Sequence, residues 1–382
     1  MSGEEDRQLG VWQNSRCRAD AFEFDLTLPG PLDFAASLEI FRRSGDDMLD
    51  RWDGKWLVRI ATDGGGVHPY ACRIGGDIET PLLCVLVRDA VERDVVERAI
   101  RAAFLPLVLE FEQLCAADPL IAHLAIKHRG FRPVLQADLL TALVRCISAQ
   151  QVNLKWAATV RRRLAEMFGR LHSVGEHSVY SLDPERLAAL QIVDIRALQF
   201  TTRKAEYIIN AARAVANGEL NIANLAELPD DEVIAKVTAI RGLGIWTAEW
   251  VLARTLGRPR VSAGDLGVRK AVGIAYFDGA MATPEEVRAA TAHWGRAAAL
   301  AQGLLLYAQH EKTLHAYAAA ASRPIIAPRG HGLDGVRPRS EPKAKFPPIT
   351  GAKLANANSP FVSQGEKLRQ PPPNLPLVRG RN

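Results

Sequence analysis

The sequence lacks the features of disulfide-stabilised, metal-binding and membrane proteins. Its 382 residues include five cysteines, which are odd in number, widely spaced and without a Cys-x-x-Cys pair. This pattern indicates neither a disulfide framework nor a zinc or iron–sulfur site. The sequence contains no run of about 18 apolar residues, so it predicts no membrane span. The acidic start, MSGEEDRQ, differs from a signal peptide, so we expect a cytoplasmic protein, nucleoid-associated if bacterial, with no membrane partner.

Positive charge is also scarce where a folded domain would need it to hold nucleic acid. The formal net charge is +5, but residues 323–382 hold eleven Lys and Arg against three Asp and Glu, a net of +8. Subtracting that +8 from +5 leaves −3 for residues 1–322. Any nucleic-acid binding by the folded part must therefore come from a local surface.

Hydrophobic periodicity divides the chain into a sheet-rich part and a helical part. Strands are predicted at 22–28, 56–61, 67–74 and 81–87, and helices at about 31–43 and 90–103. Three- and four-residue spacing predicts further helices near 137–148, 153–168, 185–190, 202–216, 230–239, 245–256, 266–275, 284–292 and 295–319. The expected fold class is α+β: a small mixed α/β domain over 15–107, an all-α domain over 108–322, and a disordered, Pro-rich basic tail over 323–382.

The stretch from Pro229 to Trp250 carries the most specific pattern. A short amphipathic helix is followed by Gly242-Leu243-Gly244 and at once by a second helix. Glycines let the backbone turn tightly and approach another molecule, and a helix N-terminus presents free N–H groups with partial positive charge. A phosphate can bind there without a lysine. This arrangement resembles the hairpin of the helix-hairpin-helix DNA glycosylase superfamily.

The resemblance implies an essential aspartate about twenty residues after the hairpin, at the start of the next helix. Asp265 lies 21 residues after Gly244 and precedes a predicted helix. An ionised carboxylate there would stabilise the oxocarbenium-like transition state of glycosidic bond cleavage and position the attacking water. Asp265 is therefore the expected catalytic residue. A lone Asp before a helix is otherwise more often an ordinary N-cap.

The motif Trp246-Thr247-Ala248-Glu249-Trp250 is similar to that of the DNA-3-methyladenine glycosylase II branch. Trp246 and Trp250, four residues apart, share one helical face. The resemblance implies that they line the pocket for an extruded base. The family's aromatic residue after Trp294 is missing here, so a further aromatic contribution would have to come from Tyr307 or be absent. Electron-rich indoles favour cationic alkylated purines. Trp246 stands where bifunctional members of the superfamily carry a lysine, so hydrolysis without strand cleavage is expected.

Double-stranded damaged DNA is the expected partner of a monomeric protein. The residues expected to contact it are Gly242, Leu243, Gly244, Thr247 and, as the wedge that fills the gap left by the flipped base, Gln151. The family implies no catalytic metal or redox cofactor, but a monovalent cation on the hairpin carbonyls.

The sequence predicts a monofunctional DNA glycosylase that excises alkylated bases of the 3-methyladenine type and leaves an abasic site. Three alternatives remain open: a glycosylase for oxidised or deaminated bases, a non-catalytic helix-hairpin-helix module that recognises bent or damaged duplex, and a scaffold that acts through its basic tail. Asp265 distinguishes a glycosylase from a non-catalytic binding module, since a pure binding module has no need of this carboxylate.

Overall fold

The computed structural model describes residues 21–64 and 66–321. Residues 15–20 of the predicted N-terminal domain and the predicted disordered tail, 323–382, lie outside the described residues. No helix in the described part is long and apolar enough to cross a bilayer.

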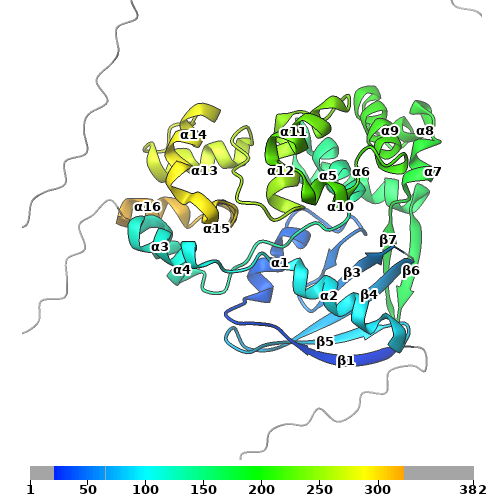
Figure 1. Cartoon of the computed structure of the whole chain (residues 1–382), viewed down its shortest axis with the longest axis horizontal. Helices are drawn as coiled ribbons and strands as arrows, with labels where there is room; N and C mark the ends of the chain where they lie inside the picture. The colour runs from blue at the N-terminus through cyan, green and yellow to red at the C-terminus, as the bar shows by residue number, and fades with distance from the viewer. Residues whose placement is uncertain (1–20, 65, 322–382) are drawn as a thin grey trace, which may run out of the picture. The chain divides into compact units, whose positions relative to one another are not determined.

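The N-terminal part is built on an antiparallel sheet with the strand order β1-β5-β4-β3-β2 (Figure 1). The strands are β1 (Phe22–Thr27), β2 (Arg51–Trp52), β3 (Trp56–Asp63), β4 (Gly66–Gly76) and β5 (Pro81–Val87). All four predicted strands are present, and so are both predicted helices, as α1 (Phe34–Arg42) and α2 (Arg93–Ala103), the second preceded by the short η1 (Ala90–Glu92). The register pairs Tyr70 with Val87 and Cys72 with Val85.

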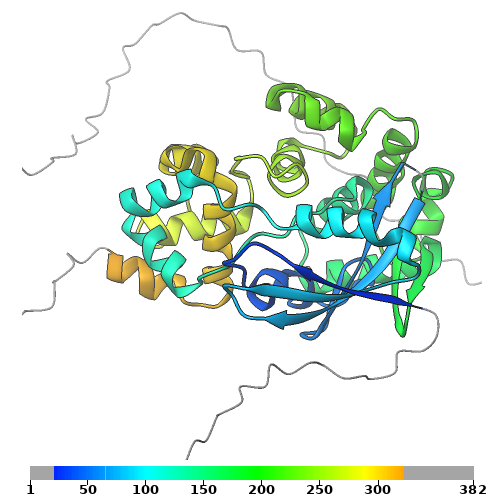
Figure 2. The same ribbon diagram turned by 60° about the horizontal axis from the view of Figure 1, so that its bottom comes forward.

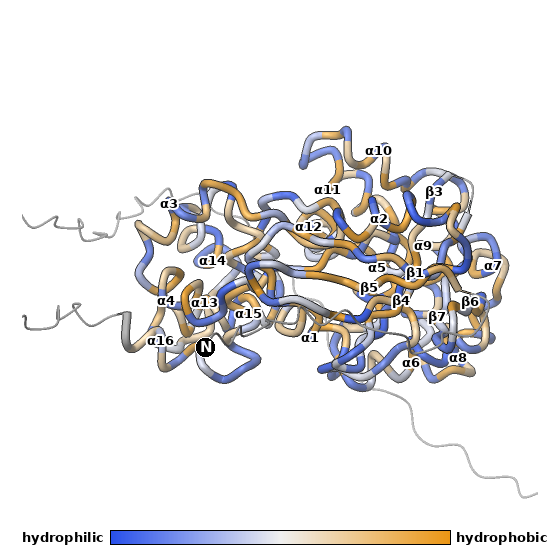
Figure 3. Tube along the Cα trace, turned by 90° about the horizontal axis from the view of Figure 1, so that it is seen from below, coloured by the Kyte–Doolittle hydropathy of each residue, from blue (hydrophilic) through white to orange (hydrophobic). Residues whose placement is uncertain are grey.

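Alternation of side chains gives this sheet two buried faces. Leu83, Val85 and Val87 of β5 face α1 and α2 in one hydrophobic core, whereas Leu86 faces a second, smaller core on the other side. This explains why β5 is apolar along nearly its whole length, as Figure 3 shows by colour.

The second face of the sheet is covered by a strand hairpin that comes from the helical part of the chain (Figure 2). Strands β6 (Arg170–Val174) and β7 (His177–Ser181) place Val174 and Val179 against Val58, Ala71 and Leu86. The predicted α+β class is confirmed, but this hairpin inside the predicted all-α domain was not anticipated.

The helices pack around two hydrophobic cores. One contains the helices α5 (Leu139–Ala149), α6 (Leu154–Phe168), α7 (Pro184–Ala188), α8 (Ile192–Arg196), α9 (Thr202–Ala216), α10 (Ile222–Glu227), α11 (Asp230–Ala239) and α12 (Ile245–Arg254). The other contains α3 (Leu109–Ala117), α4 (Pro119–Lys127), α13 (Leu266–Tyr276), α14 (Pro284–Thr291), η2 (Ala292–Ala297), α15 (Ala298–His310) and α16 (Leu314–Ala321). The segment 255–265 leads from α12 in the first core to α13 in the second.

Candidate active site

The predicted hairpin joins α11 to α12 through residues 240–244. Gly242 has a φ of +101°, and a Cβ at this position would lie 2.1 Å from Cγ of Tyr207. Leu243 is buried in the first helical core, so only its backbone faces outward. Gly244 is exposed, and a Cβ built on it meets no atom of the described chain within 4 Å. Gly242 thus permits the turn, whereas Gly244 leaves the backbone open to a ligand.

The N-terminus of α12 is directed to solvent. Gly244 is its N-cap, and no side chain caps the free N–H groups of the first turn. Ile245, the first helical residue, is 57% exposed. Thr247, which was also predicted to contact DNA, is only 1% exposed, so the structure does not place it on the surface. The first turn of α12 therefore offers backbone donors and a partial positive charge to an anion.

Asp265 is held by donors from two helices. It is the N-cap of α13, where its Oδ1 accepts a hydrogen bond from the Val268 N–H at 3.0 Å. Its Oδ2 accepts a hydrogen bond from Nε1 of Trp246 at 2.9 Å. Donors at both oxygens suit an ionised carboxylate, which only accepts. The structure thus brings Asp265 and Trp246, two predicted site residues, into direct contact.

Trp250 and Tyr307 lie on different elements. Trp250 is half-buried on α12, one turn after Trp246. Tyr307 is on α15, where its ring stacks on Phe131 with centroids 4.7 Å apart and lines a small cavity beside Arg254. Burial, and then the charges of nearby carboxylates, raise the pKa of the Tyr307 phenol to about 12. Arg254, four residues after Trp250, is a neighbour of this site that the sequence reasoning missed.

The turn between α5 and α6 lies against the hairpin. Nε2 of Gln150 donates to the Gly242 carbonyl at 3.3 Å, and Nζ of Lys204 donates to the Ser148 carbonyl at 2.9 Å. Gln151, the predicted wedge, is exposed at the tip of this turn with a φ of +53°. The predicted wedge and the predicted hairpin are therefore parts of one connected surface.

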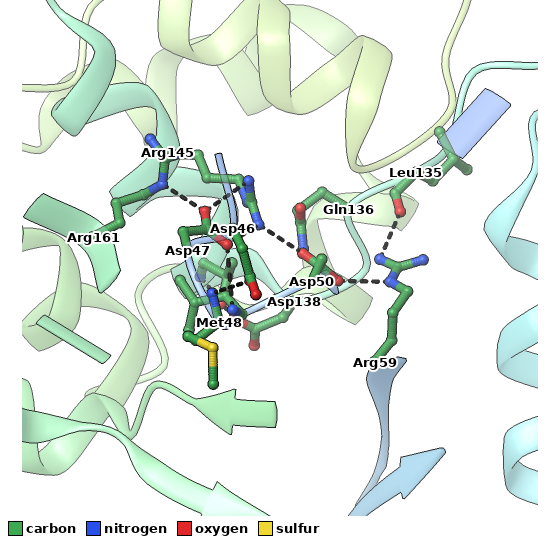
Figure 4. Close-up of polar contacts among 12 residues, drawn as sticks. Asp46, Asp47, Met48, Asp50, Arg59, Leu135, Gln136, Asp138, Arg145 and Arg161 are labelled. Carbon is green, nitrogen blue, oxygen red and sulfur yellow. Dashed lines mark hydrogen bonds and ion pairs between the residues drawn. The ribbon is translucent and has the colours of Figure 1, made fainter. Parts of the chain in front are cut away.

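A buried network of ion pairs holds this turn against the N-terminal part (Figure 4). Asp47 accepts from Nε of Arg161 at 2.7 Å and pairs with Arg145 at 3.0 Å. Nη1 of Arg161 continues to the Ser148 hydroxyl at 2.9 Å. Burial alone would raise the pKa of Asp47, but the two guanidinium groups hold it below the usual aspartate range. Asp50 extends the network, and its Oδ1 accepts a hydrogen bond from Nε of Arg59 at 2.6 Å.

This network was missed because sequence spacing gives no sign of it. Asp47 and Arg161 are 114 positions apart, and neither lies in a recognisable motif. The only available signal was the unusual run of charges on the predicted helix over 153–168. Among the described residues there is no group of three or more His, Cys, Asp or Glu side chains placed to hold a metal ion.

Comparison with known proteins agrees with this geometry. Residues 144–297 match the model of the HhH-GPD superfamily base excision DNA repair protein. The chain is 36% identical over 148 residues to a putative DNA-3-methyladenine glycosylase of Bacillus subtilis, a match that covers 38% of this chain and 50% of the relative. The chain thus spans about half the length of that curated relative.

Solved structures show the same fold over a longer range. A 3-methyladenine DNA-glycosylase from Archaeoglobus fulgidus superposes with a TM-score of 0.66 at 23% identity, covering 75% of this chain and 98% of that one. An 8-oxoguanine glycosylase/lyase from Clostridium acetobutylicum, solved in complex with double-stranded DNA, superposes with a TM-score of 0.58 at 17% identity, covering 74% and 93%. With its hairpin and its capping aspartate in place, the chain is similar over residues 144–297 to the HhH-GPD superfamily of base excision DNA repair proteins, and over 148 residues to a putative DNA-3-methyladenine glycosylase.

Proposed function

We propose that this protein is a monofunctional DNA glycosylase that excises alkylated bases of the 3-methyladenine type and leaves an abasic site. The observation that carries this proposal is the contact between Trp246 and Asp265, which fixes a carboxylate at the start of α13 beside an indole of α12. The relative from Bacillus subtilis that is 36% identical to this chain is named a putative DNA-3-methyladenine glycosylase, which supports the same substrate class.

Asp265 would act on the sugar. Loss of the base leaves positive charge on the anomeric carbon, and a carboxylate that is already oriented stabilises this charge without reorganising. The hydrogen bonds from Val268 and Trp246 hold both oxygens in place. The same carboxylate would position the water that attacks the sugar.

Hydrolysis without strand cleavage is expected because the residue that contacts Asp265 is Trp246 and not a lysine. Strand cleavage by β-elimination requires an amine that forms a Schiff base with the sugar. Trp246 offers an indole N–H, which is not a nucleophile, and this N–H is already bonded to Asp265. Borohydride treatment of the reaction should therefore trap no covalent adduct between protein and DNA.

Duplex DNA would be bound, by a monomer, along the surface formed by the hairpin and the α5–α6 turn. The uncapped N-terminus of α12 would hold a backbone phosphate through its N–H groups, close to the exposed Gly244. Gln151 would enter the stack in place of the flipped base. Backbone donors of this kind explain how a part of the chain with net negative charge can hold DNA.

We also propose that the hairpin binds a monovalent cation. The carbonyls of Ile240 and Gly242 accept hydrogen bonds from the Leu243 N–H and from Gln150, and each carbonyl oxygen has a second lone pair. The hairpin therefore fits a cation that these oxygens would hold. DNA affinity measured at constant ionic strength in potassium and in tetramethylammonium chloride tests this, because loss of affinity in the second salt is expected.

The proposed activity is tested with duplex DNA that carries 3-methyladenine or 7-methylguanine. Wild-type protein should release free base and leave abasic sites before any alkali treatment. Asp265→Asn should lower release at least about a hundredfold, or roughly 3 kcal/mol, while DNA binding is retained. Asn is a good N-cap, so α13 should still begin normally.

The matched control is Asp183→Asn, which makes the same exchange at the N-cap of α7. It should leave base release unchanged. Equal activity of wild type and Asp265→Asn would remove Asp265 from the mechanism, and no release by wild type on either lesion would overturn the proposed substrate class.

A further inference from the structure

Three residues form a stripe along one face of α12. Trp246, Trp250 and Arg254 are spaced four residues apart, so their side chains project from the same side of the helix. The first contacts Asp265, and the third lines a cavity together with Tyr307. The stripe thus runs from the proposed catalytic carboxylate to that cavity.

Arg254, which is half-buried, differs from the buried arginines Arg59 and Arg161. Arg59 and Arg161 are each paired with an aspartate, at 2.6 and 2.7 Å. Within the described part of the chain, the Arg254 guanidinium has neither an ion pair nor a hydrogen bond. Burial, and then repulsion from Arg43, lower its pKa to about 10, against an attraction from Asp265. A half-buried guanidinium that has no partner within the protein keeps its N–H donors available for an electron-rich group of a ligand.

The cavity beside Arg254 is small. Its volume is about 20 Å³, and its walls include Arg43, Phe131, Leu306 and Tyr307. This is room for a single oxygen-sized group and not for a ring. Arg43 adds a second guanidinium, so the cavity favours an electron-rich atom and disfavours a donor.

The cavity wall extends to the proposed catalytic residue. Gly267 lies in the first turn of α13, and a Cβ built on it would be 3.4 Å from Cδ2 of Leu306 and 3.0 Å from Oδ1 of Asp265. Leu306 therefore borders the cavity on one side and the surroundings of Asp265 on the other. A base that reaches Asp265 would thus have its far edge near Arg254.

Resting on the proposed glycosylase function, we propose that Arg254 recognises an oxygen at C6 of the extruded purine. The enzyme then prefers 6-oxopurine lesions, such as 7-methylguanine and hypoxanthine, to the 6-amino lesion 3-methyladenine. A guanidinium has five N–H donors and no acceptor, so it bonds a carbonyl oxygen and opposes an amino group. Trp246 and Trp250 lie on the same face of α12 as Arg254, where they would contact the ring of the base.

Two methylated purines isolate this effect from charge. Both 7-methylguanine and 3-methyladenine are cationic in DNA, so repulsion by Arg254 and Arg43 acts on both. The difference that remains at position 6 is a carbonyl oxygen in one and an amino group in the other. The two bases also differ in the 2-amino group and in the methylated nitrogen, so recognition of position 6 is read from the change in the ratio of their release rates when Arg254 is replaced.

The experiment uses one DNA sample methylated so that it carries both lesions, and the released bases are separated by chromatography after correction for spontaneous loss. Arg254→Met keeps the length of the side chain but removes its donors. It should lower release of 7-methylguanine at least about tenfold relative to 3-methyladenine. Arg254→Lys keeps one charged donor group, so its ratio of 7-methylguanine to 3-methyladenine release should fall between the ratios of wild type and Arg254→Met. Arg213→Met, an exposed arginine on α9, is the control and should leave the ratio unchanged.

Thermal unfolding separates recognition from a structural role. Because the half-buried Arg254 guanidinium has no partner among the described residues, Arg254→Met should leave the Tm close to that of wild type. An unchanged ratio of the two bases in Arg254→Met overturns the inference and leaves the glycosylase function standing. An equal loss of both bases with a lower Tm also overturns it, because Arg254 would then be structural. Release of neither base by wild type removes the proposed function itself.

Discussion

At Asp265, one carboxylate meets a donor from each of the two helical cores. The Val268 N–H belongs to α13, and the Trp246 indole belongs to α12. An indole in this position does more than provide an apolar surface, because its N–H orients the group that stabilises the sugar cation. Trp246 is thus a positioning residue for Asp265 as well as a predicted pocket wall.

Removal of this N–H is predicted to slow catalysis without unfolding the protein. Trp246→Phe keeps an aromatic ring but loses the donor to Oδ2 of Asp265. The rate of base release under single-turnover conditions should fall by about tenfold or more, since a hydrogen bond to a charged group contributes roughly 1.5–3 kcal/mol. Trp56→Phe, which makes the same exchange on β3 of the N-terminal sheet, serves as the control. Equal effects of the two exchanges on the rate would contradict the positioning role.

The left-handed backbone of Gln151 gives a second residue-scale prediction. A side chain at a φ of +53° is strained, and glycine relieves that strain. Gln151→Gly should therefore keep or raise the Tm while weakening affinity for lesion-containing duplex by about tenfold, because unstacking a base costs a few kcal/mol that a wedge offsets. Fluorescence anisotropy measures the affinity. Unchanged affinity would remove Gln151 as the wedge.

At the scale of elements, the hairpin between α11 and α12 is fixed by two glycines with different constraints. Gly242→Ala should lower the free energy of unfolding by about 2–4 kcal/mol, from backbone strain and from the contact with Tyr207. Gly244→Ala should leave stability nearly unchanged but weaken DNA binding. Urea unfolding and DNA titration of both variants test this. Similar unfolding free energies for the two would show that Gly242 is not constrained.

Helices and strands with a regular spacing of apolar residues were predicted from the sequence, whereas several short elements without such spacing were not. The four main strands and the helices α5, α6, α7, α9, α11, α12, α13 and α14 lie where the pattern places them, whereas the single helix predicted over 295–319 is divided into η2, α15 and α16. The helices α3 and α4 were missed because their apolar residues are crowded around Pro119 without a clear polar face. Strands β6 and β7 hold few inward residues, chiefly Val174 and Val179, which is too little alternation to recognise.

The candidate site was predictable only in part. The hairpin, Asp265 and Trp246 are close in sequence and follow a motif, so spacing locates them together. Arg254 lies on the same helix but outside the motif, and its lack of a partner is visible only in three dimensions. The contact of Gln150 with Gly242 spans 92 positions, which no local pattern reveals.

At the scale of the whole molecule, the network around Asp47 makes folding sensitive to acid. Asp47 has a lowered pKa in the folded state, because Arg145 and Arg161 outweigh the effect of burial. Its contribution to stability is therefore present above the pKa of an unfolded aspartate, about 4, and is lost as the pH falls through its lower folded value. The α5–α6 turn should loosen with it.

This sensitivity is checked by urea unfolding of wild type and Asp47→Asn between pH 7 and pH 3. The variant should be less stable at pH 7 by about 3–5 kcal/mol, since two guanidinium groups lose their buried partner. The difference between the two proteins should shrink as the pH falls below about 4. A constant difference across this range would show that Asp47 does not titrate with folding.

The strand hairpin β6–β7 limits how far this protein can be treated as a set of modules. It is inserted between α6 and α7, yet its apolar side chains complete the core of the N-terminal sheet. If the chain were cut after α2, the sheet would lose the cover over Val58, Ala71 and Leu86, and the helical fragment would expose Val174 and Val179. Residues 144–297 match one family model, but this hairpin packs against the N-terminal sheet, so we expect that an exchange of the N-terminal part between relatives would have to include the hairpin.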